Sequence, residues 1–298
     1  MNQLNQSHEK LFILGVGAQR SGTTWLHAQL NRCESVDMGF TKEYHIFTNR
    51  KRNLRGEWRR HKRNQERLLQ TLGSTKRLSH EEFLHLSAEE KQLLMRIRHH
   101  HYFEYFDRLV EQNSAIKATG DISPYYAKLN ADALQYIRKR LLKKGFKVKI
   151  IFLMRDPIER ILSQLNLIWR DHIQAPICHQ NDPDLALATY FNTPGIERHS
   201  RYEKTLTAID SAFPKEDIFI ELHERLFTPE THHRLTEFLD LELPTPEFNT
   251  IINSAPGPRA QNQQLLQDVA RYYKSTYRYC QNRFGPDVNT LWPYSKLL

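Results

Sequence analysis

The chain has 298 residues, a net charge of +9 and a pI of about 9.4. This length suits one large α/β domain or two small ones, and the basic charge favours anionic ligands. Three widely spaced cysteines exclude a disulfide framework and indicate a reducing compartment. The first ten residues lack the apolar core of a signal peptide, and no stretch approaches the roughly 20 apolar residues of a membrane span. We therefore expect a cytoplasmic protein.

The amino-terminal motif is a short apolar run followed by glycines and a polar turn. Residues 11–14 are predicted to form a buried strand that Gly15 and Gly17 end, and residues 23–30 are predicted to form a helix. Free backbone N–H groups and the helix dipole attract negative charge at such a helix start. The motif predicts a nucleotide phosphate cradle. The alternative is a tight strand-to-helix turn whose glycines serve packing.

The cradle fits neither of two common nucleotide-binding motifs. Residues 17–24 read G-A-Q-R-S-G-T-T, which has the glycine spacing of a Walker A loop but places Thr23 where the lysine is required. The dinucleotide motif G-x-G-x-x-G also fails, because Arg20 stands at its third glycine. The loop therefore differs from that of an ordinary nucleotide triphosphatase or dehydrogenase.

The same loop resembles the 5′-phosphosulfate-binding loop of sulfotransferases that use 3′-phosphoadenosine 5′-phosphosulfate (PAPS). The resemblance rests on Gln19, Arg20, Ser21, Gly22, Thr23, Thr24, Trp25 and Leu26. It implies that the residues from Gln19 to Trp25 bind PAPS and that the product is 3′,5′-adenosine bisphosphate. The family scheme needs no metal.

A second motif follows an apolar run at residues 148–154, which is typical of a central parallel strand. Arg155 stands at the strand end, Asp156 is a good helix N-cap, and Ser163 lies on the predicted helix. This arrangement resembles the family's 3′-phosphate motif. A phosphate monoester suits a forked guanidinium and a hydroxyl donor. The alternative for Arg155 is an ion pair with Asp156 or Glu159.

A third motif, T-K-E-Y-H-I-F at residues 41–47, is similar to the K-E-x-H-F-F segment of heparan sulfate 3-O-sulfotransferases and their bacterial relatives. The resemblance implies that Glu43 is the general base and that His45 lies beside it. An acceptor hydroxyl has a pKa far above 7, so a carboxylate must take its proton during transfer. The alternative makes Glu43 and Lys42 loop charges and His45 a packed histidine.

The chain also departs from the family pattern. Residues 121–126 resemble the family's E-K-[ST]-P-x-Y segment, but the lysine position holds Ile122 and the lysine common in the cradle is Arg20. We therefore expect Arg20 to neutralise the leaving phosphate, with Lys42 and His45 as helpers. Ser123 is expected either to bind the substrate or loop, or only to end a strand.

A late loop carries Gly257 and Arg259 ahead of the last predicted helix. Both resemble members of the family's basic loop that closes over the 3′-phosphate and adenine. The alternative is an ordinary Pro-Gly turn.

The remaining pattern completes the predicted fold. Further strands are expected at residues 33–39, 115–120 and 218–221, and helices at 130–144, 202–213, 229–239 and 262–283. We predict one α/β domain over residues 1–298, a three-layer sandwich with a central parallel sheet similar to P-loop NTPases. A helical insertion is expected at about residues 50–110.

The insertion is strongly basic at residues 50–63 and 96–101. These runs predict either a solvated helical face or a wall for an anionic acceptor, and residues 171–200 are expected on the acceptor side. The consecutive histidines His99, His100 and His101 are expected to point apart on a helix, so a shared metal is not expected.

The resulting hypothesis is in-line sulfuryl transfer from PAPS to a hydroxyl of a glycan, lipid-linked sugar or natural-product alcohol. One alternative is a small-molecule or nucleoside kinase, which needs a Walker lysine and a magnesium carboxylate. The other is a basic nucleic-acid-binding module, with steep salt dependence and no nucleotide requirement. We expect no nucleic-acid partner, and the oligomeric state stays open.

Overall fold

A single parallel sheet forms the centre of the computed structural model, which describes residues 10–48, 79–170, 182–246, 248 and 257–298. Its strand order is β2-β3-β1-β4-β5, and every neighbouring pair is parallel. The bounds are β1 Lys10–Gly17, β2 Val36–Asp37, β3 Ala118–Ile122, β4 Phe146–Met154 and β5 Ile218–Leu222. The predicted parallel sheet is confirmed. The predicted single-domain extent stays a prediction.

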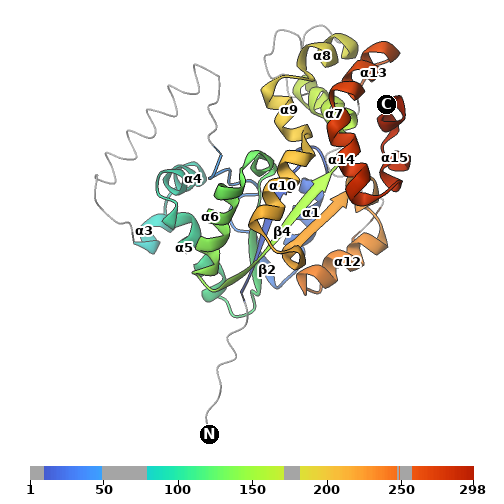
Figure 1. Ribbon diagram of the computed structural model, residues 1–298. Helices are drawn as coiled ribbons and strands as arrows, with labels where there is room; N and C mark the ends of the chain where they lie inside the picture. Colours follow the sequence, from blue (N-terminus) through green and yellow to red (C-terminus); the bar gives the residue numbers. More distant parts are fainter. Residues whose placement is uncertain (1–9, 49–78, 171–181, 247, 249–256) are drawn as a thin grey trace.

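Helices cover both faces of this sheet and bury two apolar cores (Figure 1). Phe12 and Leu14 of β1 face one core, and Ile13 faces the other, as the two-residue period of a strand requires. The first core includes α5 (His100–Glu111), α6 (Ala131–Leu142) and α10 (Tyr202–Ala212), and the second includes α1 (Thr23–Asn31) and α12 (Pro229–Leu239). This is the three-layer α/β sandwich that the sequence predicts.

The other helices group at two sides of the sheet (Figure 1). The insertion contributes α3 (His80–Leu84), α4 (Ala88–Ile97) and α5, so its described part is helical as predicted; residues 50–78, with their basic runs, lie outside the described residues. The remaining elements are α7 Pro157–Arg170, α8 Pro183–Tyr190, α9 Pro194–Ser200, α11 His223–Leu226, α13 Gln263–Tyr272, α14 Lys274–Phe284, α15 Asp287–Leu291, η1 Pro124–Lys128, η2 Lys215–Asp217 and η3 Pro293–Leu297.

The first strand continues through Gly15, contrary to the prediction, and ends at Gly17. Gly15 pairs with Ile122 of β3 and Ile151 of β4, so it lies inside the strand. A Cβ atom at Gly15 would lie 2.6 Å from the Ile122 Cδ1 atom. Glycine is needed here for the close approach of two strands rather than for a turn.

The predicted last helix at residues 262–283 is wrong, because the structure breaks it into α13 and α14. The break is at Tyr273, whose φ of −94° and ψ of 14° leave the helical region. Tyr273 is fully buried, and its hydroxyl donates a hydrogen bond to the Phe191 carbonyl. Packing of this side chain outweighs the continuous helical pattern.

Candidate active site

The cradle lies at the carboxyl end of β1, where α1 begins. Gly22 is the N-cap of α1, and no described side chain caps the first N–H groups of the helix. Gly22 has a φ of +97°, and a Cβ atom there would lie 2.3 Å from the Leu226 Cδ2 atom. Ser21 is fully buried, and within the described residues its hydroxyl has no hydrogen-bond partner. Open N–H groups and a buried hydroxyl fit a phosphate group.

The other cradle residues divide into two kinds. Thr23 and Trp25 are buried, and the Trp25 ring packs edge-on against Phe227 at a centroid distance of 5.4 Å. The Trp25 side chain therefore belongs to the core, and only its backbone faces the cradle. Gln19 and Thr24 are half-buried, and the Thr24 hydroxyl accepts a hydrogen bond of 2.7 Å from the Lys42 Nζ atom.

Lys42, Glu43 and His45 form one connected group beside the cradle. The Glu43 carboxylate accepts from the Lys42 Nζ atom at 2.8 Å and pairs with the His45 Nε2 atom at 2.8 Å. Burial raises the pKa of Glu43, but the His45 hydrogen bond and the Lys42 charge outweigh it and lower the pKa to about 2. The predicted base is therefore linked to the cradle helix through Lys42 and Thr24.

Arg20 and Lys42, the two side chains considered for neutralising the leaving phosphate, occupy different places. The Arg20 Nε atom donates to the Ser163 hydroxyl at 3.0 Å, which groups Arg20 with the predicted 3′-phosphate residues. Lys42 instead joins the cradle helix to Glu43. The sequence ranked Arg20 first for the leaving phosphate, because chain proximity alone does not reveal that Lys42 reaches the cradle.

The second motif and the late loop meet on α7. Glu159 pairs with the Arg155 Nη2 atom at 2.8 Å and with the Arg259 Nη1 atom at 3.0 Å. A Cβ atom at Gly257 would lie 2.6 Å from the Asn166 side chain, so the loop contacts α7 closely. The Arg155–Glu159 ion pair named as the alternative is present. A bound phosphate would compete with Glu159 for both guanidinium groups.

Two further residues support this region. Asp156 caps α7 as predicted, accepting from the Ile158 N–H at 2.8 Å and the Glu159 N–H at 3.3 Å. His223 was not identified from the sequence; it begins α11 and lies 3.4 Å from the Cβ position of Gly22. Burial and the charge of Arg155 lower the pKa of His223 to about 4. Its place directly after a parallel strand was the available signal.

A row of rings runs from His45 through Tyr125 to α9. The Tyr125 ring lies edge-on to His45 at 5.1 Å and to His199 at 4.9 Å, measured between ring centroids. The Lys128 Nζ atom lies 4.6 Å from the Tyr125 ring centroid. Part of the predicted acceptor region, residues 182–200, therefore reaches the vicinity of His45, whereas residues 171–181 lie outside the described residues.

The side chains of His100 and His101 do not point apart, contrary to the prediction. His100, His101 and Glu104 at the start of α5 bring three ligand atoms within 4.8 Å of one another. The first helical turn lets two neighbouring rings converge, with centroids 4.0 Å apart, rather than point apart. The absence of a metal role stays a prediction.

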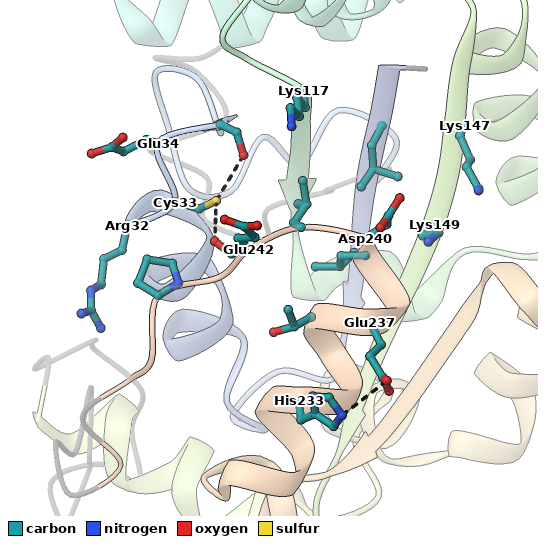
Figure 2. Close-up of a pocket in the computed structure, with 16 residues that line it drawn as sticks. Arg32, Cys33, Glu34, Lys117, Lys147, Lys149, His233, Glu237, Asp240 and Glu242 are labelled. Atoms are coloured by element: carbon teal, nitrogen blue, oxygen red, sulfur yellow. Dashed lines mark hydrogen bonds and ion pairs between the residues drawn. The ribbon is translucent and has the colours of Figure 1, made fainter. Parts of the chain in front are cut away.

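A separate pocket of about 940 Å³ opens near the amino ends of the strands, away from the cradle (Figure 2). Its lining includes Leu11, Lys117 and Lys147, which lie at the amino ends of β1, β3 and β4. Ligands of parallel α/β sheets bind at the carboxyl ends of the strands, where the cradle lies. This pocket is therefore distinct from the candidate active site.

The fold is that of an α/β protein, and the residues of the candidate site suit a nucleotide phosphate. A model described as the sulfotransferase family matches residues 12–245. The chain belongs to the sulfotransferase family, and it is a PAPS-dependent transferase. No curated protein sequence matches the chain.

Solved structures with low sequence identity resemble the chain. A sulfotransferase from Alicyclobacillus acidocaldarius is 15% identical, with a TM-score of 0.58, and the match covers 92% of this chain and 95% of that one. This likeness supports the fold. A sulfotransferase domain from the curacin biosynthetic pathway is 18% identical, with a TM-score of 0.41, covering 83% and 80%. The sulfotransferase STF9 from Mycobacterium avium is 15% identical, with a TM-score of 0.41, covering 90% and 76%.

Among the described helices, none has the length and apolar character needed to cross a membrane.

Proposed function

We propose that the protein transfers the sulfuryl group of PAPS to an acceptor hydroxyl, with Glu43 as general base. The acceptor oxygen bonds to sulfur while the bond from sulfur to the 5′-phosphate oxygen breaks. Glu43 takes the hydroxyl proton, and 3′,5′-adenosine bisphosphate leaves. The observation that carries the proposal is the chain from Thr24 through Lys42 to Glu43, with contacts of 2.7 and 2.8 Å. It connects a phosphate cradle directly to a carboxylate.

The other site residues would bind the donor. The N–H groups from Gly22 to Thr24 and the Ser21 hydroxyl suit the 5′-phosphate, and Lys42 would stabilise charge on the oxygen that leaves. Arg155, Ser163 and Arg20 suit the 3′-phosphate, with Gly257 and Arg259 closing from the late loop. This division moves Arg20 from the leaving phosphate toward the 3′-phosphate, since its contact is Ser163. No step in this scheme uses a metal.

The low pKa of Glu43 fits a site that is activated by its donor. With a pKa of about 2, Glu43 is ionised but is a weak base. The sulfuryl group of PAPS would attract Lys42 away from Glu43. One of the two groups that lower the pKa would then be lost, and the basicity of Glu43 would rise.

The surroundings of His45 favour a polar acceptor. Tyr125 offers an aromatic ring beside His45, and Lys128 adds a cation over that ring. Rings of this kind pack against the apolar faces of sugars, while the neighbouring polar groups bind hydroxyls. We propose a glycan, a lipid-linked sugar or a natural-product alcohol as acceptor.

Calorimetric titration tests donor use. We expect 3′,5′-adenosine bisphosphate to bind much more tightly than AMP or ATP, and Arg155→Ala to weaken that binding by about 100-fold through loss of a charged hydrogen bond. Arg271→Ala is the matched control, because Arg271 pairs only locally with Asp268 on α13 in the described structure. Binding of ATP with magnesium, indifferent to a 3′-phosphate, would instead indicate a kinase.

Turnover tests the base. Bisphosphate release from PAPS is measured with a panel of acceptor alcohols. Glu43→Gln should lower kcat by about 100-fold or more, the usual contribution of a general base, and leave bisphosphate affinity unchanged. Glu34→Gln, an exposed glutamate at the other edge of the sheet, is the control. Full activity of Glu43→Gln would contradict the assignment of the base.

A further inference from the structure

The segment that carries Glu43, residues 41–47, has no helix or strand to hold it. It nevertheless includes the buried residues Tyr44, His45 and Ile46, and His45 has a φ of +53°. A non-glycine residue in this region persists only when its surroundings hold it there. Something outside the segment must therefore hold its backbone.

That support is the carboxylate of Asp121, which is fully buried in β3. It accepts hydrogen bonds from the Ser123 hydroxyl at 2.6 Å, the Tyr126 hydroxyl at 2.8 Å and the Tyr102 hydroxyl at 3.1 Å. The Tyr44 N–H also reaches it, at 3.5 Å. Four donors converge on one buried carboxylate.

Two of these hydroxyls also accept hydrogen bonds from the backbone of residues 41–47, which we call the base segment. The Ser123 oxygen accepts from the His45 N–H at 3.1 Å, and the Tyr126 oxygen accepts from the Ile46 N–H at 3.0 Å. A hydroxyl has one proton, so a hydroxyl that donates to Asp121 keeps its lone pairs for the backbone N–H. The acceptor-only carboxylate thus sets the direction of every hydrogen bond in the network.

We propose that Asp121 is a positioning residue, whose buried carboxylate holds the backbone at Tyr44, His45 and Ile46 and so directs Glu43 toward the acceptor. The proposal rests on the proposed role of Glu43 as base. It assigns no direct contact with substrate to Asp121.

The protonation state of Asp121 should then affect the reaction. Burial raises its pKa to about 6, although the hydrogen bonds from Ser123 and Tyr126 and the electrostatic interaction with His45 act in the opposite direction. The groups that face the carboxylate are Tyr102 from α5, Tyr126 from η1, Ser123, and Tyr44 and His45 from the base segment. As pH falls through about 6, Asp121 gains a proton, becomes a donor and loses part of its hold on the segment.

Asp121→Asn tests the proposal, because asparagine keeps the shape but replaces one acceptor oxygen by a donor group. We expect kcat to fall by about 10- to 100-fold, since a misplaced catalytic group costs about that much. The bisphosphate Kd and the KM for PAPS should not change. Amide hydrogen exchange at residues 44–46 should accelerate, and the acid limb of kcat near pH 6 should disappear.

Three neighbouring variants sharpen the test. Ser123→Ala and Tyr126→Phe each remove one relay to a backbone N–H, so each should give part of the Asp121→Asn effect on kcat and exchange. Tyr102→Phe is the matched control, because the Tyr102 hydroxyl donates to the same carboxylate and, among the described residues, has no hydrogen bond to the backbone of residues 41–47. It should leave kcat within about twofold of the parent enzyme.

The outcomes distinguish the positioning role of Asp121 from the proposed role of Glu43 as base. If Asp121→Asn retains full kcat and normal exchange at residues 44–46, or if its acid limb persists, the positioning role is wrong. Loss of bisphosphate affinity together with kcat would also overturn it, because general unfolding would then explain both. If exchange accelerates as expected but Glu43→Gln is fully active, the support of the segment stands and the assignment of Glu43 as base fails.

Discussion

At the scale of single residues, the site concentrates backbone conformations that side chains avoid. Among the described non-glycine residues, Arg20, His45 and Asp240 have positive φ values, of 66°, 53° and 56°. Asp240 ends α12, where a left-handed cap is common, but Arg20 and His45 belong to the candidate site. Conformations of this kind cost about 1–3 kcal/mol each and tend to occur where function needs a fixed geometry.

Lys42 contacts both the cradle helix, at Thr24, and the proposed base, Glu43. Lys42→Met should lower kcat by about 100-fold, because a positioned cation at the leaving group contributes about that much. The pKa of Glu43 should rise from about 2, since one of its two partners is removed. Carboxyl NMR titration measures the pKa, and Lys139→Met on the exposed face of α6 is the control. An unchanged pKa and kcat would rule out this role.

At the scale of elements, the start of α1 determines whether the cradle can form. Its first N–H groups stay open because glycine at the N-cap offers no side chain to cap them, so an anion can take that place. The same glycine lets α11 approach, with Leu226 against the space that a Cβ atom would need. One small residue thus leaves room both for the proposed ligand and for the packing of α11.

Gly22→Ala should therefore damage stability and binding together. The positive φ and the clash with Leu226 should destabilise the protein by about 1–3 kcal/mol, and the bisphosphate should bind more weakly. Urea unfolding and calorimetry measure the two effects. Gly195→Ala on α9 is the control, because no atom lies within 4 Å of its Cβ position. It should leave stability unchanged or raise it by up to about 1 kcal/mol.

At the scale of the whole molecule, the carboxyl-terminal segment forms hydrogen bonds with Asp156 and Glu224, close to the proposed 3′-phosphate residue Arg155. Asp156, beside Arg155, accepts from the Tyr277 hydroxyl at 2.8 Å and the Tyr294 N–H at 3.1 Å. Glu224, after β5, accepts from the Trp292 ring nitrogen at 3.2 Å. Residues far apart in the chain thus hold the start of α7, and with it the proposed 3′-phosphate site.

The buried Asp156 makes stability depend on pH. Burial raises its pKa to about 7 from the ordinary 3.8, so between these values the folded state binds the proton more tightly than the unfolded state. Its contribution to the free energy of unfolding is then largest at low pH and decreases as pH rises toward 7. Asp156→Asn should remove this slope, as measured by urea unfolding from pH 5 to pH 8. A difference between variant and parent that is constant with pH would contradict the prediction.

Much of the fold was readable from local pattern. The apolar runs of β1, β4 and β5 predict buried strands, and Asp156 marks the start of α7, because such signals act within a few residues. Gly15 of β1 and the break at Tyr273 were misread. Both depend on groups from other parts of the chain, the Ile122 side chain in the first case and the Phe191 carbonyl in the second.

The sequence by itself determined the family and the parallel α/β architecture, and it predicted the residues that we propose for phosphate binding and proton removal, since all of these signals reside in contiguous motifs. Only the tertiary structure decided their partners: Lys42 on Thr24, Arg20 on Ser163, and Glu159 between two arginines. It also placed the Asp121 carboxylate where the Tyr44 N–H and the Ser123 hydroxyl reach it. Hydrogen bonds and ion pairs depend on distances of a few ångströms between side chains, and those distances are fixed only when the sheet and its helices pack together.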